Sequence, residues 1–100
     1  MTNSNYPQTG IIILAAGNSS RLGQAKQLLD FKGEKLLQIA IDIAEESLSS
    51  ANLVVLGAYE DQIKKSIDFQ SCEIVINENW SAGLSSSMKE GLSAMIENHA

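Results

Sequence analysis

The chain has 100 residues, of which 44% are hydrophobic and 19% charged, an ordinary globular composition that excludes wholesale disorder. This length supports one modest domain and is too short for two. The net charge of −5 argues against a nucleic-acid backbone as the main partner, because such proteins normally carry the opposite charge. It leaves small phosphate ligands open, since a local pair of cations can hold a triphosphate.

The single cysteine, Cys72, excludes an internal disulfide and fits a reducing compartment. No histidine lies near it in the sequence, so it reads as a small hydrophobic residue rather than a nucleophile. No apolar run reaches the roughly 18–20 residues of a membrane span, and the polar N-terminus lacks the basic region of a signal peptide. We therefore expect a cytoplasmic protein with no membrane or nucleic-acid partner, with a flexible lead-in over residues 1–9 and one domain over residues 10–100.

The first half of the chain alternates an apolar strand with a helix. Residues 11–14 form a β-branched run typical of a strand buried on both faces of a parallel sheet. A loop is expected to follow through residue 26, and residues 30–33 have turn composition. Apolar residues recur at helical spacing over residues 34–48, which predicts an amphipathic helix.

The second half repeats this alternation twice. Residues 53–56 predict a second buried strand closed by Gly57, residues 60–67 a short surface helix, and residues 73–76 a third strand. After a loop over residues 77–83, a third helix is predicted from its apolar stripe of Leu84, Met88, Leu92 and Met95, with Met88 and Met95 expected in the core. Gly91 inside that helix predicts close packing against the sheet.

The element order β-α-β-α-β-α predicts a Rossmann-like three-layer α/β sandwich around a parallel sheet with right-handed crossovers. Three strands make a small open sheet, roughly the first half of a doubly wound fold. Such a sheet has an exposed edge, so self-association through that edge is one possible interaction.

The loop after the first strand carries residues suited to a phosphate ligand. In open α/β sheets, ligands bind beyond the carboxyl ends of the strands. Gly17 allows close approach of the backbone, Ser19 and Ser20 supply hydroxyl donors, and Arg21 and Lys26 supply two cations within six residues. The alternative is a solvated polar loop with ordinary surface charges.

Two common phosphate motifs are excluded by spacing. A Walker A loop needs G-x-x-x-x-G-K-[ST], but Gly17 and Gly23 are six residues apart and Gln24 follows. The dinucleotide fingerprint G-x-G-x-x-G is also absent, because Asn18 and Ser19 follow Gly17.

Residues 14–26 read L-A-A-G-N-S-S-R-L-G-Q-A-K and are similar to the signature L-A-A-G-x-S-x-R-[ML]-G-x-x-K of nucleotidyltransferases with a glycosyltransferase-A-like α/β fold. Residues 27–29 and 33–37 resemble the family's continuation. Residues 77–92 resemble N-x-x-W-x-x-G-[ML]-x-x-S-[LM]-x-x-G-[LM] of the molybdenum-cofactor cytidylyltransferase-like branch. The guanylyltransferase relatives usually read L-A-G-G where this chain has Ala16. The resemblance covers residues 10–96, so the chain looks like the N-terminal half of such a domain.

The resemblance implies a role for each matching residue. The nucleotide would contact the end of the first strand and the loop after it, through Leu14, Ala15, Ala16, Gly17, Ser19 and Ser20. Arg21 and Lys26 would be catalytic, holding the triphosphate and offsetting the charge that builds on it. The wall around base and ribose would include Gly57, Asn77, Gly83 and Ser87. The implied reaction is attack by an acceptor phosphate, such as that of a molybdopterin-type cofactor, on the α-phosphorus of CTP or a related NTP. Pyrophosphate would leave, and Mg²⁺ would bridge the phosphates.

The family's metal-holding aspartate, in an Asp-x-Pro motif, would lie beyond Ala100, as would the acceptor-binding region. We therefore expect the 100-residue chain to bind nucleotide weakly and to lack turnover. Two alternatives are a non-catalytic nucleotide-binding module and an α/β interaction domain that binds no nucleotide. Trp80 could stack on a base or pack in the loop, and residues 85–87 could contact the ligand or cap the helix.

Overall fold

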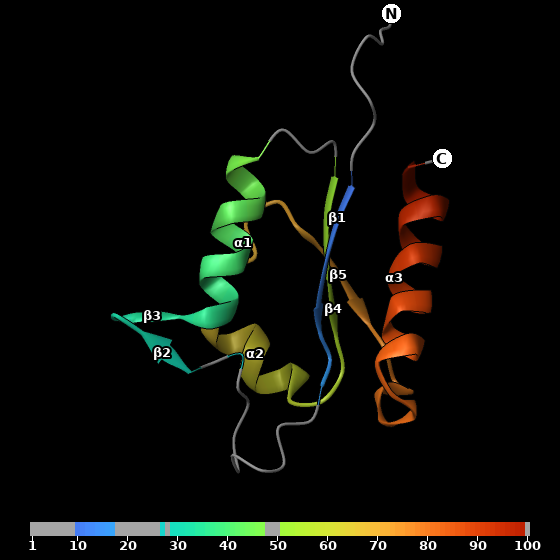
Figure 1. The fold of residues 1–100 in the computed structure, drawn as a ribbon, viewed down its shortest axis with the longest axis horizontal. Coiled ribbons are helices and arrows are strands. Elements are labelled where there is room, and N and C mark those ends of the chain that lie inside the picture. The colour runs from blue at the N-terminus through green and yellow to red at the C-terminus, as the bar shows by residue number, and fades with distance from the viewer. Residues whose placement is uncertain (1–9, 18–26, 28, 48–50, 100) are drawn as a thin grey trace, which may run out of the picture.

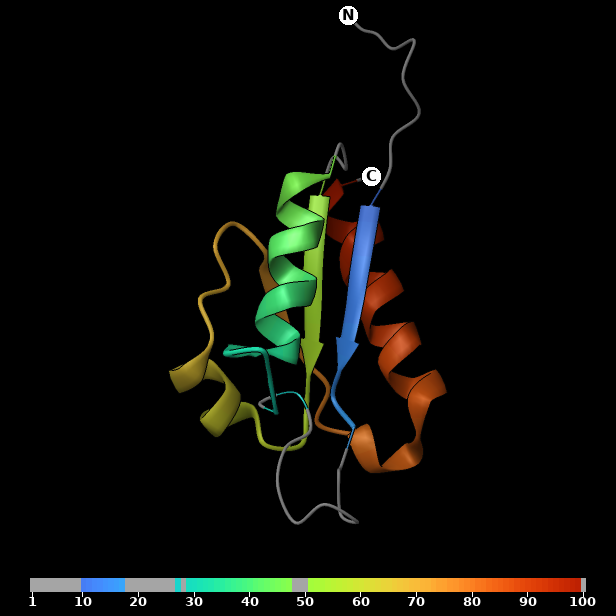
Figure 2. The same cartoon turned by 60° about the vertical axis from the view of Figure 1, so that its left-hand side comes forward.

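A computed structural model describes residues 10–17, 27, 29–47 and 51–99. Its main sheet has three parallel strands, β1 (Gly10–Ala15), β4 (Ala51–Leu56) and β5 (Glu73–Ile76), in the order β1-β4-β5. Gly10 pairs with Ala51 and Leu53 with Glu73, so the three carboxyl ends lie together. Figure 1 views this sheet along its edge with β1 nearest the viewer, and Figure 2 separates β1 from β4. The predicted parallel sheet is confirmed.

Helices cover both faces of the sheet. α1 (Leu36–Glu46) and α2 (Glu60–Ser66) lie on one face, and α3 (Leu84–His99) lies on the other (Figure 1). This arrangement confirms the three-layer α/β sandwich predicted from the element order. No helix among the described residues has the length and apolar character that crossing a membrane requires.

β4 is the centre of the core because both faces of this strand are covered. Leu53, Val54, Val55 and Leu56 are all fully buried. Val54 and Leu56 pack with Leu37, Ile41 and Ile63 of the α1–α2 layer, whereas Leu53 and Val55 face the α3 layer. Since successive side chains of a strand point to opposite faces, one apolar run supplies both halves of the core.

A short hairpin precedes α1 and replaces the first turn of the predicted helix. β2 (Asp30–Phe31) pairs antiparallel with β3 (Glu34–Lys35). The two residues between them, Lys32 and Gly33, have φ of 52° and 90°, the backbone of a two-residue hairpin turn. The turn predicted at residues 30–33 is confirmed, but the helix predicted from residue 34 begins only at Leu36 because this hairpin uses residues 34 and 35.

α3 contacts the sheet through Gly91 and Met95, whereas its other large apolar residues stay exposed. A Cβ on Gly91 would lie 2.8 Å from Ile12 Cγ2 and 3.1 Å from Val55 Cγ2, which confirms the close approach predicted there. Met95 packs beside Gly10 as expected. Met88, however, is 47% exposed, so its predicted core position is wrong. Helical geometry explains this, because Ser87, Gly91 and Met95 already occupy the side that touches the sheet.

Cys72 is buried just before β5 and lies against a carboxylate. Its thiol donates to Glu45 Oε2 at 3.5 Å, and Glu45 also accepts hydrogen bonds from Ser71 and Asn52. These bonds, that from Ser71 foremost, lower the pKa of Glu45. Burial, and then the neighbouring Glu45, raise the pKa of the Cys72 thiol from 9.0 to about 11. The thiol therefore stays protonated near neutral pH, which agrees with its reading as a small hydrophobic residue.

We expect Cys72 in the native chain to react with a disulfide reagent at pH 8 about 100-fold more slowly than in the urea-unfolded chain, because its thiolate fraction is smaller by that factor. Since the folded pKa lies above the unfolded one, the stability that this group contributes is present below pH 9 and is lost as the pH rises from 9 towards 11. Thiol-reaction rates and urea unfolding across this range measure both effects. Glu45→Gln should speed the native reaction, and equal rates in the two states would contradict this account.

Candidate functional site

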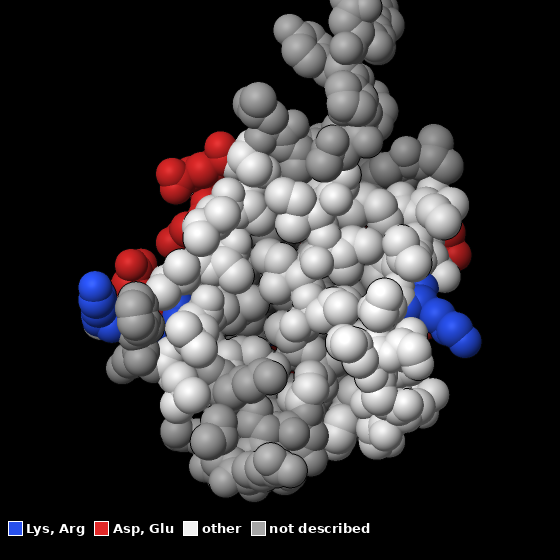
Figure 3. Space-filling view, in the orientation of Figure 1, with Lys and Arg blue, Asp and Glu red and all other residues white. Residues whose placement is uncertain are grey.

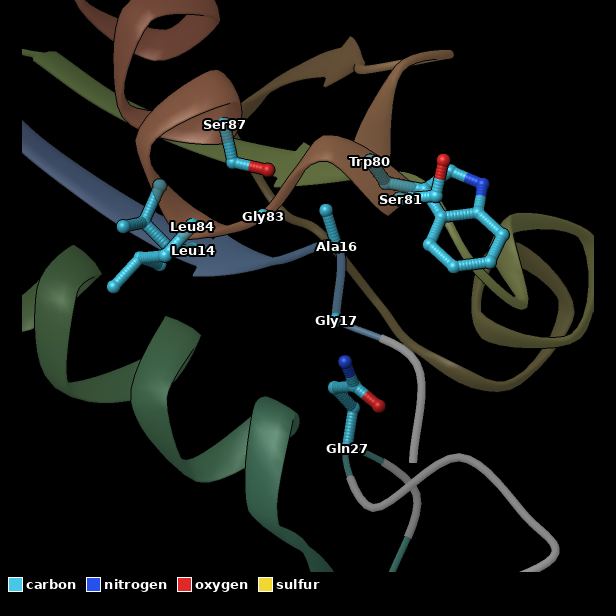
Figure 4. Close-up of a pocket in the computed structure, with 9 residues that line it drawn as sticks. All are labelled: Leu14, Ala16, Gly17, Gln27, Trp80, Ser81, Gly83, Leu84 and Ser87. Carbon is cyan, nitrogen blue, oxygen red and sulfur yellow. The ribbon is translucent and has the colours of Figure 1, made fainter. Parts of the chain in front are cut away.

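A pocket of about 470 Å³ opens where β1 ends and α3 begins. It lies at the carboxyl end of a parallel strand, where open α/β sheets bind their ligands. Its size falls within the usual range for small-molecule sites. Figure 4 shows the lining residues converging from β1, the segment before α1, the 3₁₀ turn Trp80–Ala82 and the start of α3. They are Leu14, Ala16, Gly17, Gln27, Trp80, Ser81, Gly83, Leu84 and Ser87.

The end of β1 forms the floor of this pocket. Ala16 is buried, and its carbonyl accepts a 3.1 Å hydrogen bond from the Ala58 amide, which fixes the chain after the strand. Gly17 is exposed, and a Cβ added to it would meet no atom within 4 Å. Gly17 therefore leaves open space that a side chain would fill, as a close approach of ligand to backbone requires.

Gln27, which precedes the β2–β3 hairpin in the chain, places a buried side-chain amide in the pocket wall. The residue is 7% exposed, and its Nε2 donates to the Ala15 carbonyl at 2.9 Å. Its Oε1 is buried and accepts no hydrogen bond from the residues that the structure describes. Figure 4 places Gln27 directly beside Gly17. An amide oxygen that is buried without a donor is costly, and such an atom in a pocket wall is a candidate ligand contact.

Asn77 lies behind the pocket wall that the start of α3 forms, and its hydrogen bonds hold that wall in place. It follows β5, is 1% exposed, and its amide Nδ2 donates to both Ser86 Oγ and Ser87 Oγ at 2.9 Å. Its Oδ1 accepts from the Asn79 amide at 3.0 Å, and its own amide donates to the Leu56 carbonyl. The side chain thus ties the loop after β5 to the first turn of α3. It positions the wall and does not line the pocket.

The first turn of α3 presents donors to the pocket. Ser87 is 4% exposed, and because its oxygen accepts from Asn77, its hydroxyl hydrogen remains available for donation. Gly83 precedes the helix with φ of 109°, a conformation that a side chain would strain. The helix N-terminus carries a partial positive charge, so this wall suits an electron-rich ligand.

Gly57 and Trp80 form a close contact behind the pocket. A Cβ on Gly57 would lie 2.7 Å from Trp80 Cβ and 3.0 Å from both Ala16 Cβ and the Asn77 carbonyl. Trp80 packs against the core on the α3 side and also lines the pocket (Figure 4). The two interpretations left open for Trp80 are therefore compatible, because one side of the ring can pack while another faces a ligand.

The pocket brings together some of the predicted site residues and not others. Leu14, Ala16, Gly17, Gly83 and Ser87 line it. Ala15, Gly57 and Asn77 lie behind its walls, where they support residues that line it. Ser19, Ser20, Arg21 and Lys26 lie outside the described residues. Gln27 was missed as a site residue, although it directly follows the Lys26 that ends the loop signature.

The described residues do not form a metal site. Among them no group of three or more His, Cys, Asp or Glu residues lies close enough to hold a cation. The described pocket lining also contains no carboxylate. Mg²⁺ is normally held by one or two carboxylates together with substrate phosphates and water. The magnesium expectation placed its ligand aspartate beyond Ala100, so it stays a prediction.

Comparison with known proteins finds relatives of similar sequence and fold. Nicotine blue oxidoreductase of Paenarthrobacter nicotinovorans is 31% identical over 101 residues, which cover 99% of this chain and 50% of that protein. Rv0371c of Mycobacterium tuberculosis H37Rv superposes with a TM-score of 0.70 at 27% identity, over 82% of this chain and 43% of the other. Its homologue from Mycobacterium sp. strain JC1 gives 0.74 at 31% identity, over 86% and 43%.

A manganese complex of Rv0371c superposes with a TM-score of 0.61 at 23% identity, over 70% of this chain and 36% of that one, a likeness of fold alone. The chain thus spans about half the length of these relatives. Residues 11–100 match the model of the MobA-like NTP transferase domain. Because this match takes in nearly the whole chain, the protein belongs to the MobA-like NTP transferase domain family.

Proposed function

We propose that this chain is the nucleotide-binding part of a nucleotidyltransferase that transfers a nucleoside monophosphate, CMP from CTP, to a phosphate-bearing acceptor with release of pyrophosphate. A molybdopterin-type cofactor is the acceptor that the molybdenum-cofactor cytidylyltransferase branch suggests. One observation carries the proposal: the pocket at the end of β1 joins an open glycine, a buried unpartnered amide oxygen and the N-terminus of a helix. The family supports the same reading.

The lining suits a nucleobase with a polar edge. Leu14, Trp80 and Leu84 supply apolar or aromatic surface against which the flat faces of a base can lie. Ser87 can donate to a ring nitrogen or carbonyl oxygen of the base, and the positive end of α3 favours the same electron-rich edge. Gly17 lets the ligand reach the backbone at the end of β1.

Arg21 and Lys26 remain the proposed phosphate-binding and catalytic residues. Both follow Gly17 closely in sequence, so a nucleotide in the pocket would carry its phosphates towards the loop that bears them. A guanidinium and an ammonium there would offset the charge that builds on the triphosphate as the α-phosphorus is attacked. Ser19 and Ser20 are proposed as hydroxyl donors to the same phosphates. Mg²⁺, when bound, would supply further charge neutralisation.

A second candidate function is nucleotide binding without transfer. The similarity to nicotine blue oxidoreductase favours this candidate, because the reaction class in that name is oxidoreduction and not nucleotidyl transfer. A site that serves transfer from CTP should bind the triphosphate with Mg²⁺ more tightly than CMP. Equal affinity for CTP and CMP would favour the second candidate.

We expect isothermal titration with CTP, GTP, UTP and ATP, each with Mg²⁺, to give the highest affinity for CTP, with a dissociation constant of about 1 mM, or about −4 kcal/mol. Ser87→Ala should weaken CTP binding by about 1 kcal/mol because it removes one donor. Ser93→Ala is the matched control, since Ser93 lies exposed on the same helix away from the pocket. No heat with any nucleotide would contradict the proposal, and tighter binding of another base would reject CTP.

The cellular setting is also part of the proposal. We propose a cytoplasmic enzyme of molybdenum-cofactor biosynthesis, in keeping with the single protonated cysteine and with the sequence resemblance. Its partners would be a nucleoside triphosphate and a small phosphate-bearing acceptor, with no nucleic acid or membrane.

A further inference from the structure

A buried amide behind the pocket determines which way one hydroxyl group in the pocket wall points. Asn77 is 1% exposed, and its side chain joins the loop after β5 to the first turn of α3. Ser87 accepts one of its hydrogen bonds and lines the pocket at the end of β1. Because Asn77 does not line the pocket itself, it acts on a ligand only through the residues that it positions.

The backbone fixes the orientation of the Asn77 side-chain amide. The Asn79 backbone amide donates to Asn77 Oδ1 at 3.0 Å, and a backbone N–H group can only donate, so the oxygen must lie on that side. Nδ2 therefore faces α3, where it donates to Ser86 Oγ and to Ser87 Oγ, each at 2.9 Å. The opposite orientation would set the NH₂ group against the Asn79 N–H group, a donor against a donor. Both hydrogens of Nδ2 are thus committed to the two serines.

The two serines differ in where their hydroxyl hydrogens go. Ser86 donates to the carbonyl of Gly83 at 2.8 Å or to that of Asn79 at 3.0 Å, so its hydrogen is used within the loop. Ser87 accepts from Asn77, and none of the described residues accepts a hydrogen bond from it. Since Nδ2 of Asn77 has no lone pair to offer, the Ser87 hydrogen cannot turn towards it. Ser87 is 4% exposed, so this hydrogen is left for the pocket (Figure 4).

The charge around this wall acts in the same direction as the hydroxyl hydrogen. Ser87 lies in the first turn of a 16-residue helix, whose N-terminus carries a partial positive charge. The described pocket lining contains no carboxylate. Figure 3 views the molecule from the β1 side, and the charged side chains of the described residues lie only at the left and right margins of that view. The wall therefore favours an electron-rich atom of the ligand.

We infer that Asn77 is a positioning residue that keeps Ser87 a hydrogen-bond donor, so that this wall binds an acceptor atom of the ligand and rejects a donor. A serine hydroxyl that is free to turn can donate or accept, and it would take either kind of atom. With Asn77 in place, a ligand N–H or O–H group at Ser87 would stay unpaired, which weakens binding about tenfold or more. The inference rests on the proposed function and deepens it, because the ring nitrogens and carbonyl oxygens of a nucleobase are such acceptors.

Two substitutions distinguish a reversed hydroxyl from a missing one. Asn77→Asp keeps the acceptor for the Asn79 amide but replaces the NH₂ group with an oxygen, so Ser87 must donate to it and turn its lone pairs to the pocket. Ser87→Ala removes the hydroxyl. We expect CTP with Mg²⁺ to bind about fivefold more weakly to Ser87→Ala and about 20-fold more weakly to Asn77→Asp, because only the latter sets two acceptors against each other. Titration followed by nuclear magnetic resonance measures these affinities.

A double variant shows whether Asn77 acts through Ser87. In the Ser87→Ala background, Asn77→Asp should weaken CTP binding by less than about twofold, because no hydroxyl is left to reverse. Ser86→Ala is the matched control, since it removes the other acceptor of Asn77 Nδ2 and leaves the bond to Ser87, and it should also change binding by less than about twofold. Circular dichroism checks that each variant folds. An equal effect of Asn77→Asp with and without the Ser87 hydroxyl would overturn the inference.

Hydrogen exchange of the wild-type chain supplies a readout that needs neither a nucleotide nor a variant, so it also decides the case if Asn77→Asp does not fold. Both Nδ2 hydrogens of Asn77 should exchange with water about tenfold or more slowly than those of Asn79, whose side chain is exposed. Fast exchange of either Asn77 hydrogen would overturn the inference even if CTP binds. Slow exchange of both without any binding of CTP would contradict the proposed function, and with it the ligand that the inference assigns to this wall.

Discussion

Replacing Asn77 with alanine is expected to lower the free energy of unfolding by about 3–5 kcal/mol. The side chain is 1% exposed and takes part in three hydrogen bonds, with Ser86, Ser87 and the Asn79 amide. Its loss leaves Ser87 Oγ buried without its partner, and a buried polar group left unpaired costs about 1–3 kcal/mol. A domain of this size has about 5–15 kcal/mol of stability in all, so the variant should be close to unfolding.

Urea denaturation followed by circular dichroism measures this effect. Asn79→Ala is the matched control. Asn79 is exposed and bonds to Asn77 through its backbone amide, which the substitution keeps. The control should change stability by less than about 0.5 kcal/mol. Loss of stability in Asn79→Ala equal to that in Asn77→Ala would show that the Asn77 hydrogen bonds do not hold the loop to α3.

Substitution of the two glycines near the pocket should affect stability differently, with a clear loss at Gly57 and little change at Gly17. Gly57→Ala is expected to cost about 1–3 kcal/mol, because the added methyl would lie 2.7 Å from Trp80 Cβ in a packed wall. Gly17→Val should change stability by less than about 1 kcal/mol, since a Cβ there meets no atom within 4 Å. The larger side chain is tolerated at residue 17 because it enters the open pocket.

Thermal unfolding of the two variants beside the wild-type chain gives the comparison. We expect a lower midpoint for Gly57→Ala and a nearly unchanged one for Gly17→Val. If Gly17→Val were the more destabilised variant, the space beside Gly17 would be needed for folding and not for a ligand.

The strands of the main sheet could be predicted from the sequence because they are short apolar runs, which is typical of strands buried inside a parallel sheet. The run at residues 53–56 can be buried on both faces only in the centre of a sheet, and β4 occupies that place. The hairpin over residues 30–35 could not be predicted as strands. Its two pairs of residues are too short for a period-2 pattern, and Lys32, a non-glycine residue, adopts positive φ in its turn.

The helix α3 shows where periodicity misleads. Its large apolar residues recur at helical spacing, and such a stripe normally faces the core. Here the sheet is approached by Gly91 and Ser87, which no hydrophobicity pattern marks as the buried side. Leu84, Met88 and Leu92 of the stripe stay exposed instead. Only the contacts of Gly91 show which side of the helix faces the sheet.

Part of the candidate site could be predicted from the sequence, because ligands of open α/β sheets bind at the carboxyl ends of the strands. Gly17 is far from Gly83 and Ser87 in sequence, and the shared ends of parallel strands bring the three to one pocket. Gln27 was missed because its contribution is a tertiary one. Its amide reaches the Ala15 carbonyl across twelve residues, and its unpartnered oxygen becomes visible only once the chain is folded.

The central claim is that a nucleotide binds in the pocket beside Gly17, and the fluorescence of Trp80 tests it most directly. Trp80 is the single tryptophan of the chain and lines this pocket, so its emission reports on that place alone. We expect saturable quenching by CTP with Mg²⁺ in the wild-type chain, at a midpoint of about 1 mM, and at least a tenfold weaker response in the stably folded Gly17→Val variant. Unchanged emission in the wild-type chain, or equal quenching in both, would contradict the account.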